Sequence, residues 1–104
     1  MDDIITKLES ILEQRKENSS ADSYVSSLYE KGNNHICEKI IEEAQELVDA
    51  TKENEKRITH ETADLFFHVL VLLASHDIKY ATILDELERR FGTSGIEEKN
   101  NRNK

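Results

Sequence analysis

The sequence predicts an all-α protein, a helical bundle of four to five helices in one domain that spans residues 1–104. Two compositional observations favour helices over sheets: the chain has no Pro and only three Gly, and Glu, Lys, Leu, Ile and Ala dominate. The third observation is periodicity, because apolar residues recur every three or four positions in most segments. A chain of 104 residues can bury one modest core.

The first two predicted helices are separated by a polar linker. Residues 2–16 carry a single apolar stripe, and "ENSSADS" follows, so an N-terminal helix and linker occupy residues 1–20. A second helix at 23–31 ends at "KGNN", where Gly32 or an Asn can adopt the left-handed conformation that terminates helices.

Two longer helices are predicted at 35–52 and 59–75, on either side of the polar break "ENEK". Thr59 is the candidate N-cap of the second one, which then reads "ADLFFHVLVLLA" and is apolar almost all round. A fifth helix is expected at 80–91, followed by a break at "GTSG" and a short last turn or frayed tail at 96–104.

Charge and hydropathy indicate a cytoplasmic protein. The net charge of −8 disfavours nucleic acid and anionic membranes as partners. The longest apolar run, 69–74, is too short to span a bilayer, and Asp2 and Asp3 have the wrong sign for a signal peptide. The lone Cys37 fits a reducing compartment and is expected to be a small core residue.

The stretch "EKIIEEAQE" places Glu38, Glu42 and Glu46 one helical turn apart. Like charges at this spacing repel by a few tenths of a kcal/mol per pair. Two interpretations stay open at this point. The acidic stripe is either the solvated face of an amphipathic helix or part of a cation site.

Carboxylates also occur where the chain is most apolar. Glu61 and Asp64 are i, i+3 neighbours and so point the same way. If the two long helices pack side by side, Glu43 and Glu46 can meet them across a cleft, where either protonation or a divalent cation must relieve the repulsion. Oxygen ligands without a Cys or His cluster suit Mg²⁺ or Mn²⁺.

Other polar residues have both a functional and a structural interpretation. We expect His68 to be a hydrogen-bonded core residue, and the helices contain no Glu-x-x-His pair, two of which a di-iron bundle requires. Lys31, Arg89 and Arg90 can contact phosphate or simply complement the dipole at the end of a helix.

The order of these segments resembles a known family. The pattern E-E-x-x-E … E-x-x-D is similar to that of the all-α, MazG-like nucleotide pyrophosphohydrolases, and within them the chain resembles the phosphoribosyl-ATP pyrophosphohydrolase family of histidine biosynthesis. Four blocks carry the resemblance: "SYVSSLYEKG" (23–32), "EKIIEEAQE" (38–46), "ETADLFFHVLVLLA" (61–74) and "ELERRFGTSGIEEK" (86–99). Two departures are Ile41, where a small residue is common, and His35, where a Lys is common.

The resemblance implies Mg²⁺-dependent hydrolysis of phosphoribosyl-ATP to phosphoribosyl-AMP and pyrophosphate, with Mn²⁺ as a possible substitute. It carries metal ligation onto Glu43, Glu46, Glu61 and Asp64. The carboxylates that can orient a water or take its proton are Glu42 and Glu46. The candidate phosphate-binding residues are Lys31, Lys39, Arg90 and Ser94. A house-cleaning nucleoside triphosphate pyrophosphohydrolase and a non-enzymatic helical interaction module are the alternatives.

The apolar helix at 59–75 also predicts self-association. The neighbouring apolar stripes can cover only part of its surface, and soluble monomers seldom expose a large apolar patch. We therefore expect a homodimer, or an assembly of dimers, that forms through the two central helices. In such a dimer Lys31 or Arg90 of one subunit can reach substrate that is held by the other.

Overall fold

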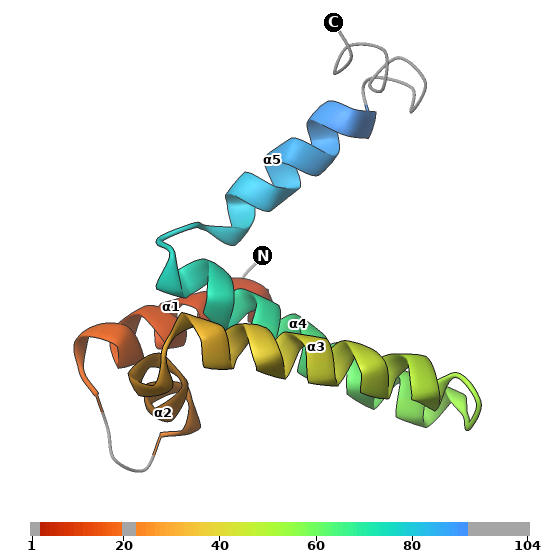
Figure 1. Cartoon of the computed structure of the whole chain (residues 1–104). Helices are drawn as coiled ribbons and strands as arrows, with labels where there is room; N and C mark the ends of the chain where they lie inside the picture. The colour runs from red at the N-terminus through yellow and green to blue at the C-terminus, as the bar shows by residue number, and fades with distance from the viewer. Residues whose placement is uncertain (1–2, 20–22, 92–104) are drawn as a thin grey trace, which may run out of the picture.

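The computed structural model describes residues 3–19 and 23–91. Within these ranges it contains five α-helices and no β-strand, which confirms the predicted all-α class. The helices are α1 (Ile4–Glu17), α2 (Tyr24–Lys31), α3 (Asn33–Ala50), α4 (Glu55–Ser75) and α5 (Tyr80–Phe91) (Figure 1). The predicted break at "GTSG" and the tail at 96–104 lie outside the described residues.

Helices α3 and α4 run side by side as a long antiparallel pair, and α1 and α2 cover one end of it (Figure 1). The hydrophobic core lies at this covered end, which joins the start of α3 to the end of α4. Its buried residues are Leu12, Val25, Leu28, Ile36, Leu70, Val71 and Ala74. Helix α5 has no fully buried residue and projects away from the pair (Figure 1). The bundle is therefore made by α1 to α4. Cys37 is only half-buried and does not belong to this core, so the prediction that it is a core residue is wrong.

Helix α4 begins one turn earlier than predicted. Its N-cap is Asn54, whose backbone is extended and whose Oδ1 accepts a hydrogen bond from the N–H of Arg57 at 2.9 Å. The prediction that Thr59 starts this helix is therefore wrong. The first turn of α4 is exposed to solvent and carries no apolar periodicity, so it resembles a polar break, but Asn54 and the acidic Glu55 are the residue types that helix starts favour.

Replacing Asn54 by alanine should test this helix start directly. Asn54→Ala should lower the free energy of unfolding by about 1 kcal/mol, because an orphan N–H of the first turn loses its side-chain acceptor. Thr59→Ala is the matched control, and its effect should stay within about 0.5 kcal/mol because Thr59 is exposed inside the helix. Urea denaturation measures both variants, and the reverse order of effects would restore Thr59 as the cap.

The turn between α2 and α3 depends on glycine. Gly32 has φ +92° and ψ 180°, a conformation open essentially to glycine, and its N–H donates to the carbonyl of Leu28 at 3.1 Å. The prediction that Gly32 ends the second helix is confirmed. Because this conformation lets the next helix start at once, α3 begins at Asn33 instead of His35.

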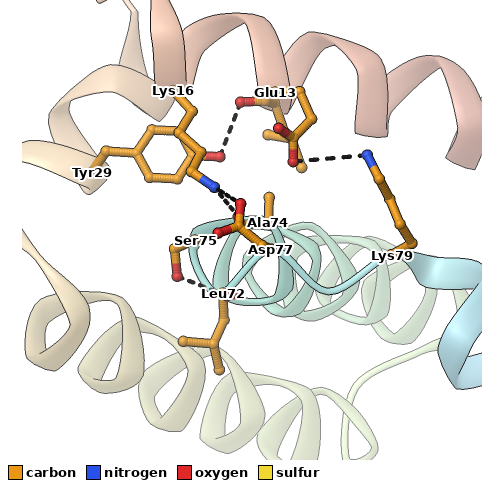
Figure 2. A network of polar contacts seen from close by, with 9 residues as sticks. Glu13, Lys16, Tyr29, Leu72, Ala74, Ser75, Asp77 and Lys79 are labelled. Carbon is orange, nitrogen blue, oxygen red and sulfur yellow. Dashed lines mark hydrogen bonds and ion pairs between the residues drawn. The ribbon is translucent and has the colours of Figure 1, made fainter.

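Side chains of α1 hold the connection between α4 and α5 (Figure 2). The ammonium group of Lys16 donates to the carbonyl oxygen of Ala74 at 2.9 Å and forms an ion pair with the carboxylate of Asp77. The hydrogen bond from Lys16 lowers the pKa of Asp77 and, reciprocally, raises that of Lys16. Asp77 has φ +59°, a left-handed conformation in which aspartate is enriched among non-glycine residues.

Two further contacts extend the same attachment toward α5. The backbone N–H of Tyr80 donates to Oε2 of Glu9 at 2.6 Å. Lys79 lies 4.0 Å from Glu13 (Figure 2). Glu9, Glu13 and Lys16 therefore follow one side of α1 and meet successive residues of the connection. This arrangement fixes the direction in which α5 leaves the bundle.

Part of α4 stays uncovered in a single chain. An apolar groove of about 250 Å³ lies between α1, α4 and α5, and Ile5, Phe66, Leu73 and Leu87 are among its lining residues. Phe66 is 56% exposed. By length and composition α4 could cross a membrane, but it packs along α3 and contains the buried carboxylate of Glu61, so we interpret it as a core helix.

Candidate active site

A row of three polar side chains follows one side of α4. Glu61, Asp64 and His68 are spaced i, i+3 and i+7, so they lie above one another over two helical turns. Glu61 is 3% exposed and His68 is 5% exposed, whereas Asp64 is partly open to solvent. This row is the polar seam of a mostly apolar helix.

The acidic residues of α3 meet this row where α3 and α4 run side by side. Oxygen atoms of Glu43, Glu46 and Glu61 lie within 4.8 Å of one another, and ligand atoms of His60, Glu61 and Asp64 form a second group of the same size. Glu61 belongs to both groups. The structure therefore brings the four predicted metal ligands into two adjoining clusters.

Glu61 is held at the centre of these clusters by an arginine. Nη2 of Arg57 donates to Oε1 of Glu61 at 2.6 Å. The other oxygen, Oε2, is buried and has no hydrogen-bond partner among the described residues, and the same holds for Oε2 of Glu43. A buried polar atom without a partner destabilises a protein by about 1–3 kcal/mol, so these two oxygens favour a cation between the helices.

The donor set fits a hard divalent cation. Two oxygens on one Mg²⁺ lie at most about 4.2 Å apart, because each Mg–O bond measures about 2.1 Å. The ligand atoms of each group lie within 4.8 Å of one another, close to this span. The residues present therefore suit Mg²⁺ or Mn²⁺, and His60 adds one nitrogen that Mn²⁺ accepts more readily than Mg²⁺.

The sequence interpretation missed Arg57 and His60. Each lies four residues before a carboxylate of α4, and the His60 ring nitrogen is 3.4 Å from Asp64. The i, i+4 spacing of opposite charges could have revealed both residues. Arg57 was missed because the helix was expected to start at Thr59. His60 lay inside the expected helix, and its spacing to Asp64 was overlooked.

Glu42 turns away from the carboxylate clusters. It is exposed on α3 and lies 3.6 Å from Lys39, its i−3 neighbour. Glu38, one turn earlier, is exposed as well. The acidic stripe of α3 is thus divided: Glu38 and Glu42 face solvent, whereas Glu43 turns toward α4 and Glu46 joins it at the edge.

The predicted phosphate-binding residues do not gather around the carboxylates. Lys31 is exposed at the end of α2, and Ser94 lies outside the described residues. Arg90 is on α5, where Nε lies 3.1 Å from Glu86. Hydrogen bonds from Arg89, and then from Arg90, lower the pKa of Glu86 to about 2.

His68 occupies the far end of the polar row as a hydrogen-bonded core residue, as predicted. Nδ1 lies 2.8 Å from the carbonyl oxygen of Asp64, and Nε2 lies 2.9 Å from the hydroxyl of Tyr24 on α2. A carbonyl oxygen can only accept, so Nδ1 carries a hydrogen. In the neutral ring the Tyr24 hydroxyl then donates to Nε2.

An antiparallel pair of helices with carboxylates gathered between them defines the chain as a helical protein with an acidic cluster that could hold a cation. Comparison with known proteins makes this assignment specific. The family model described as phosphoribosyl-ATP pyrophosphohydrolase matches residues 5–91. The chain belongs to this family of hydrolases.

Curated relatives match over nearly the whole chain. The phosphoribosyl-ATP pyrophosphatase of Vesicomyosocius okutanii is 55% identical, with 99% of each chain covered. The phosphoribosyl-ATP pyrophosphatase of Ruthia magnifica is 51% identical, again with 99% of each chain covered. The one from Geobacter metallireducens is 49% identical over 99% of this chain and 95% of its own.

Proposed function

We propose that this protein hydrolyses phosphoribosyl-ATP to phosphoribosyl-AMP and pyrophosphate, the second step of histidine biosynthesis, in the cytoplasm. Membership of the family and identity along the full chain support this substrate. The structural observation that carries the proposal is the pair of buried, unpartnered carboxylate oxygens on Glu43 and Glu61. Such oxygens suit a cation that can bridge an acidic protein and a phosphate chain.

Glu43, Glu46, Glu61 and Asp64 would hold Mg²⁺ or Mn²⁺ at this site. When bound, the ion supplies positive charge to the phosphoryl oxygens and makes water a better nucleophile. Arg57 orients Glu61 through the hydrogen bond to its Oε1, and its second oxygen is left without a hydrogen-bond partner among the described residues. These residues thereby place and align the phosphate chain.

Hydrolysis also needs a group that takes a proton from the attacking water. The water oxygen forms a bond to phosphorus, the anhydride bond between the α and β phosphates breaks, and pyrophosphate leaves. Glu46 is exposed at the edge of the cluster, so its carboxylate can accept the proton, whereas Glu42 faces away from the cluster. Lys39, beside Glu42, can contact the phosphate chain as a point charge.

Removal of divalent cations should abolish turnover and lower stability together. With EDTA, pyrophosphate release from phosphoribosyl-ATP should fall to background, and Mg²⁺ should restore it. Mg²⁺ at 100 times its Kd should stabilise the fold by about 2.7 kcal/mol, because it binds only the folded state. A thermal melt measures this effect, with NaCl at matched ionic strength as the control.

The same assay separates this proposal from its alternatives. Faster release of pyrophosphate from ordinary nucleoside triphosphates would instead indicate a house-cleaning enzyme. An interaction module would hydrolyse neither substrate, and Mg²⁺ would stabilise it no more than NaCl. Incorporation of ¹⁸O from labelled water into one product is expected for hydrolysis, and its absence would contradict the proposed reaction.

We further propose a homodimer, or a dimer of dimers, as the working unit. The uncovered groove beside α4 and the exposed ring of Phe66 support this proposal. Helix α5 leaves from the Ser75 end of α4, whereas Glu61 lies near the other end (Figure 1). Arg90 of one chain is therefore better placed to serve the site of a second chain than its own.

A further inference from the structure

Tyr24 is held rigidly although half of it is open to solvent. It is the first residue of α2 and is 50% exposed. Its hydroxyl lies 2.9 Å from Nε2 of the buried His68, which is itself fixed by the carbonyl of Asp64. The phenol therefore cannot rotate out of place without leaving a buried ring nitrogen of His68 unpartnered.

The aromatic ring of Tyr24 also packs against two other aromatic rings, those of Phe67 and His68. It stacks on Phe67 with ring centroids 6.2 Å apart and an interplanar angle of 23°. It meets the edge of His68 at 5.8 Å and 83°, and Phe67 meets His68 at 5.2 Å and 89°. These are favourable aromatic geometries, so three rings form one rigid cluster, and Tyr24 contributes its most exposed ring.

The cluster lies at the end of the polar row of α4. His68 follows Asp64 by one helical turn, about 5.4 Å along the axis, and Tyr24 contacts the side chain of His68. Glu61, at the centre of the carboxylate clusters, is two turns away. A ligand with its phosphates at the carboxylates can therefore extend along α4 and reach the Tyr24 ring with its other end.

We propose that Tyr24 is a specificity-determining residue on which the purine base of the substrate stacks. This inference rests on the proposed function, and it assigns a binding position to the base in addition to the cation site. A purine is flat and apolar on its faces, which suits an exposed, rigid aromatic ring. A purely structural role in joining α2 to α4 would explain the hydrogen bond of the Tyr24 hydroxyl. It would not explain why the ring is both exposed to solvent and held in place by stacking on Phe67.

Two substitutions separate the ring of Tyr24 from its hydroxyl. Tyr24→Leu keeps an apolar cover over Phe67 but removes the stacking surface, so KM for phosphoribosyl-ATP should rise roughly 10-fold with little change in kcat. Tyr24→Phe keeps the ring and removes the hydrogen bond to His68, so it should lower the melting temperature but change KM less than about threefold. Tyr29→Phe is the matched control, because Tyr29 lies on the same helix as Tyr24. This change removes the hydrogen bond from the Tyr29 hydroxyl to the Leu12 carbonyl, and it should leave KM unchanged.

Direct binding tests the base without requiring turnover. In calorimetric titrations with Mg²⁺, the affinity for AMP should fall roughly 10-fold in Tyr24→Leu, whereas the affinity for ribose 5-phosphate should stay at the wild-type value. An unchanged KM and AMP affinity in a variant that still turns over would overturn the stacking role alone. Equal losses for AMP and ribose 5-phosphate, or dissociation of Tyr24→Leu into monomers, would also overturn it. Absence of turnover in the wild type would instead count against the proposed function.

Discussion

Replacing Glu61 by glutamine should reduce kcat/KM for phosphoribosyl-ATP by at least about 100-fold. Glu61 is shared by both groups of candidate ligands and is 3% exposed, so no solvent-exposed residue can substitute for it. The amide keeps the size and one acceptor for Arg57, but it removes the negative charge that a divalent cation requires. Initial rates at saturating Mg²⁺ measure the effect.

Stability measurements show whether this loss is specific to the cation site. Without Mg²⁺, the free energy of unfolding of Glu61→Gln should lie within about 1 kcal/mol of the wild-type value. Relief of the repulsion from Glu43 and Glu46 offsets the weaker contact with Arg57. The stabilisation by Mg²⁺ should be largely lost. Glu38→Gln, an exposed glutamate on α3, is the control and should keep both activity and the response to Mg²⁺. A rate for Glu61→Gln near that of the wild type would refute the assignment of this site.

A charge in the uncovered groove should split the assembly and inactivate the enzyme. Phe66 lines the groove and is 56% exposed in a single chain, so a second subunit would bury it. Phe66→Glu would place a carboxylate in this apolar contact, and sedimentation equilibrium should then report a monomer near 12.0 kDa. Phe66→Leu keeps the surface apolar and should stay associated.

Mixing two inactive variants tests whether the subunits share a site. If Arg90 serves the carboxylates of the other subunit, Glu61→Gln mixed with Arg90→Ala should recover part of the activity that each lacks alone. The recovery arises in mixed dimers, where one of the two sites keeps both residues. A fully active wild-type monomer would show that the apolar face of α4 has another role.

The helices were largely predictable because their ends carry local signals. The prediction for α5 is confirmed at both ends, 80 and 91, since its amphipathic stripe stops at Phe91 before a glycine. The start of α4 was missed because its first turn lies beyond the cover of α1 and α2 and needs no apolar face. An N-cap can be recognised there only from Asn54 itself.

That single error also hid part of the candidate site. Glu61 and Asp64 were predictable as candidate site residues, because charged residues in an apolar helix need a partner. Glu43 and Glu46 followed from the expectation that the two long helices pack side by side, as α3 and α4 do. Arg57 pairs with Glu61 only if α4 has already begun, so a helix that starts at Thr59 excludes that pair. His60 and Asp64 both lie inside such a helix, and their pairing was overlooked. The contact between Tyr24 and His68 joins separate helices, and no spacing along the chain encodes it.

The attachment of α1 to the α4–α5 connection has a consequence for the order in which the parts of the chain fold. Glu9 and Tyr80 are 71 positions apart, and Lys16 and Asp77 are 61 apart. Helix α1, which precedes α4 in the chain, thus sets the orientation of the helix that follows α4, and such non-local contacts form slowly. Orientation of α5 is therefore a late folding event, and a deletion of the N-terminal helix would release the opposite end of the described chain.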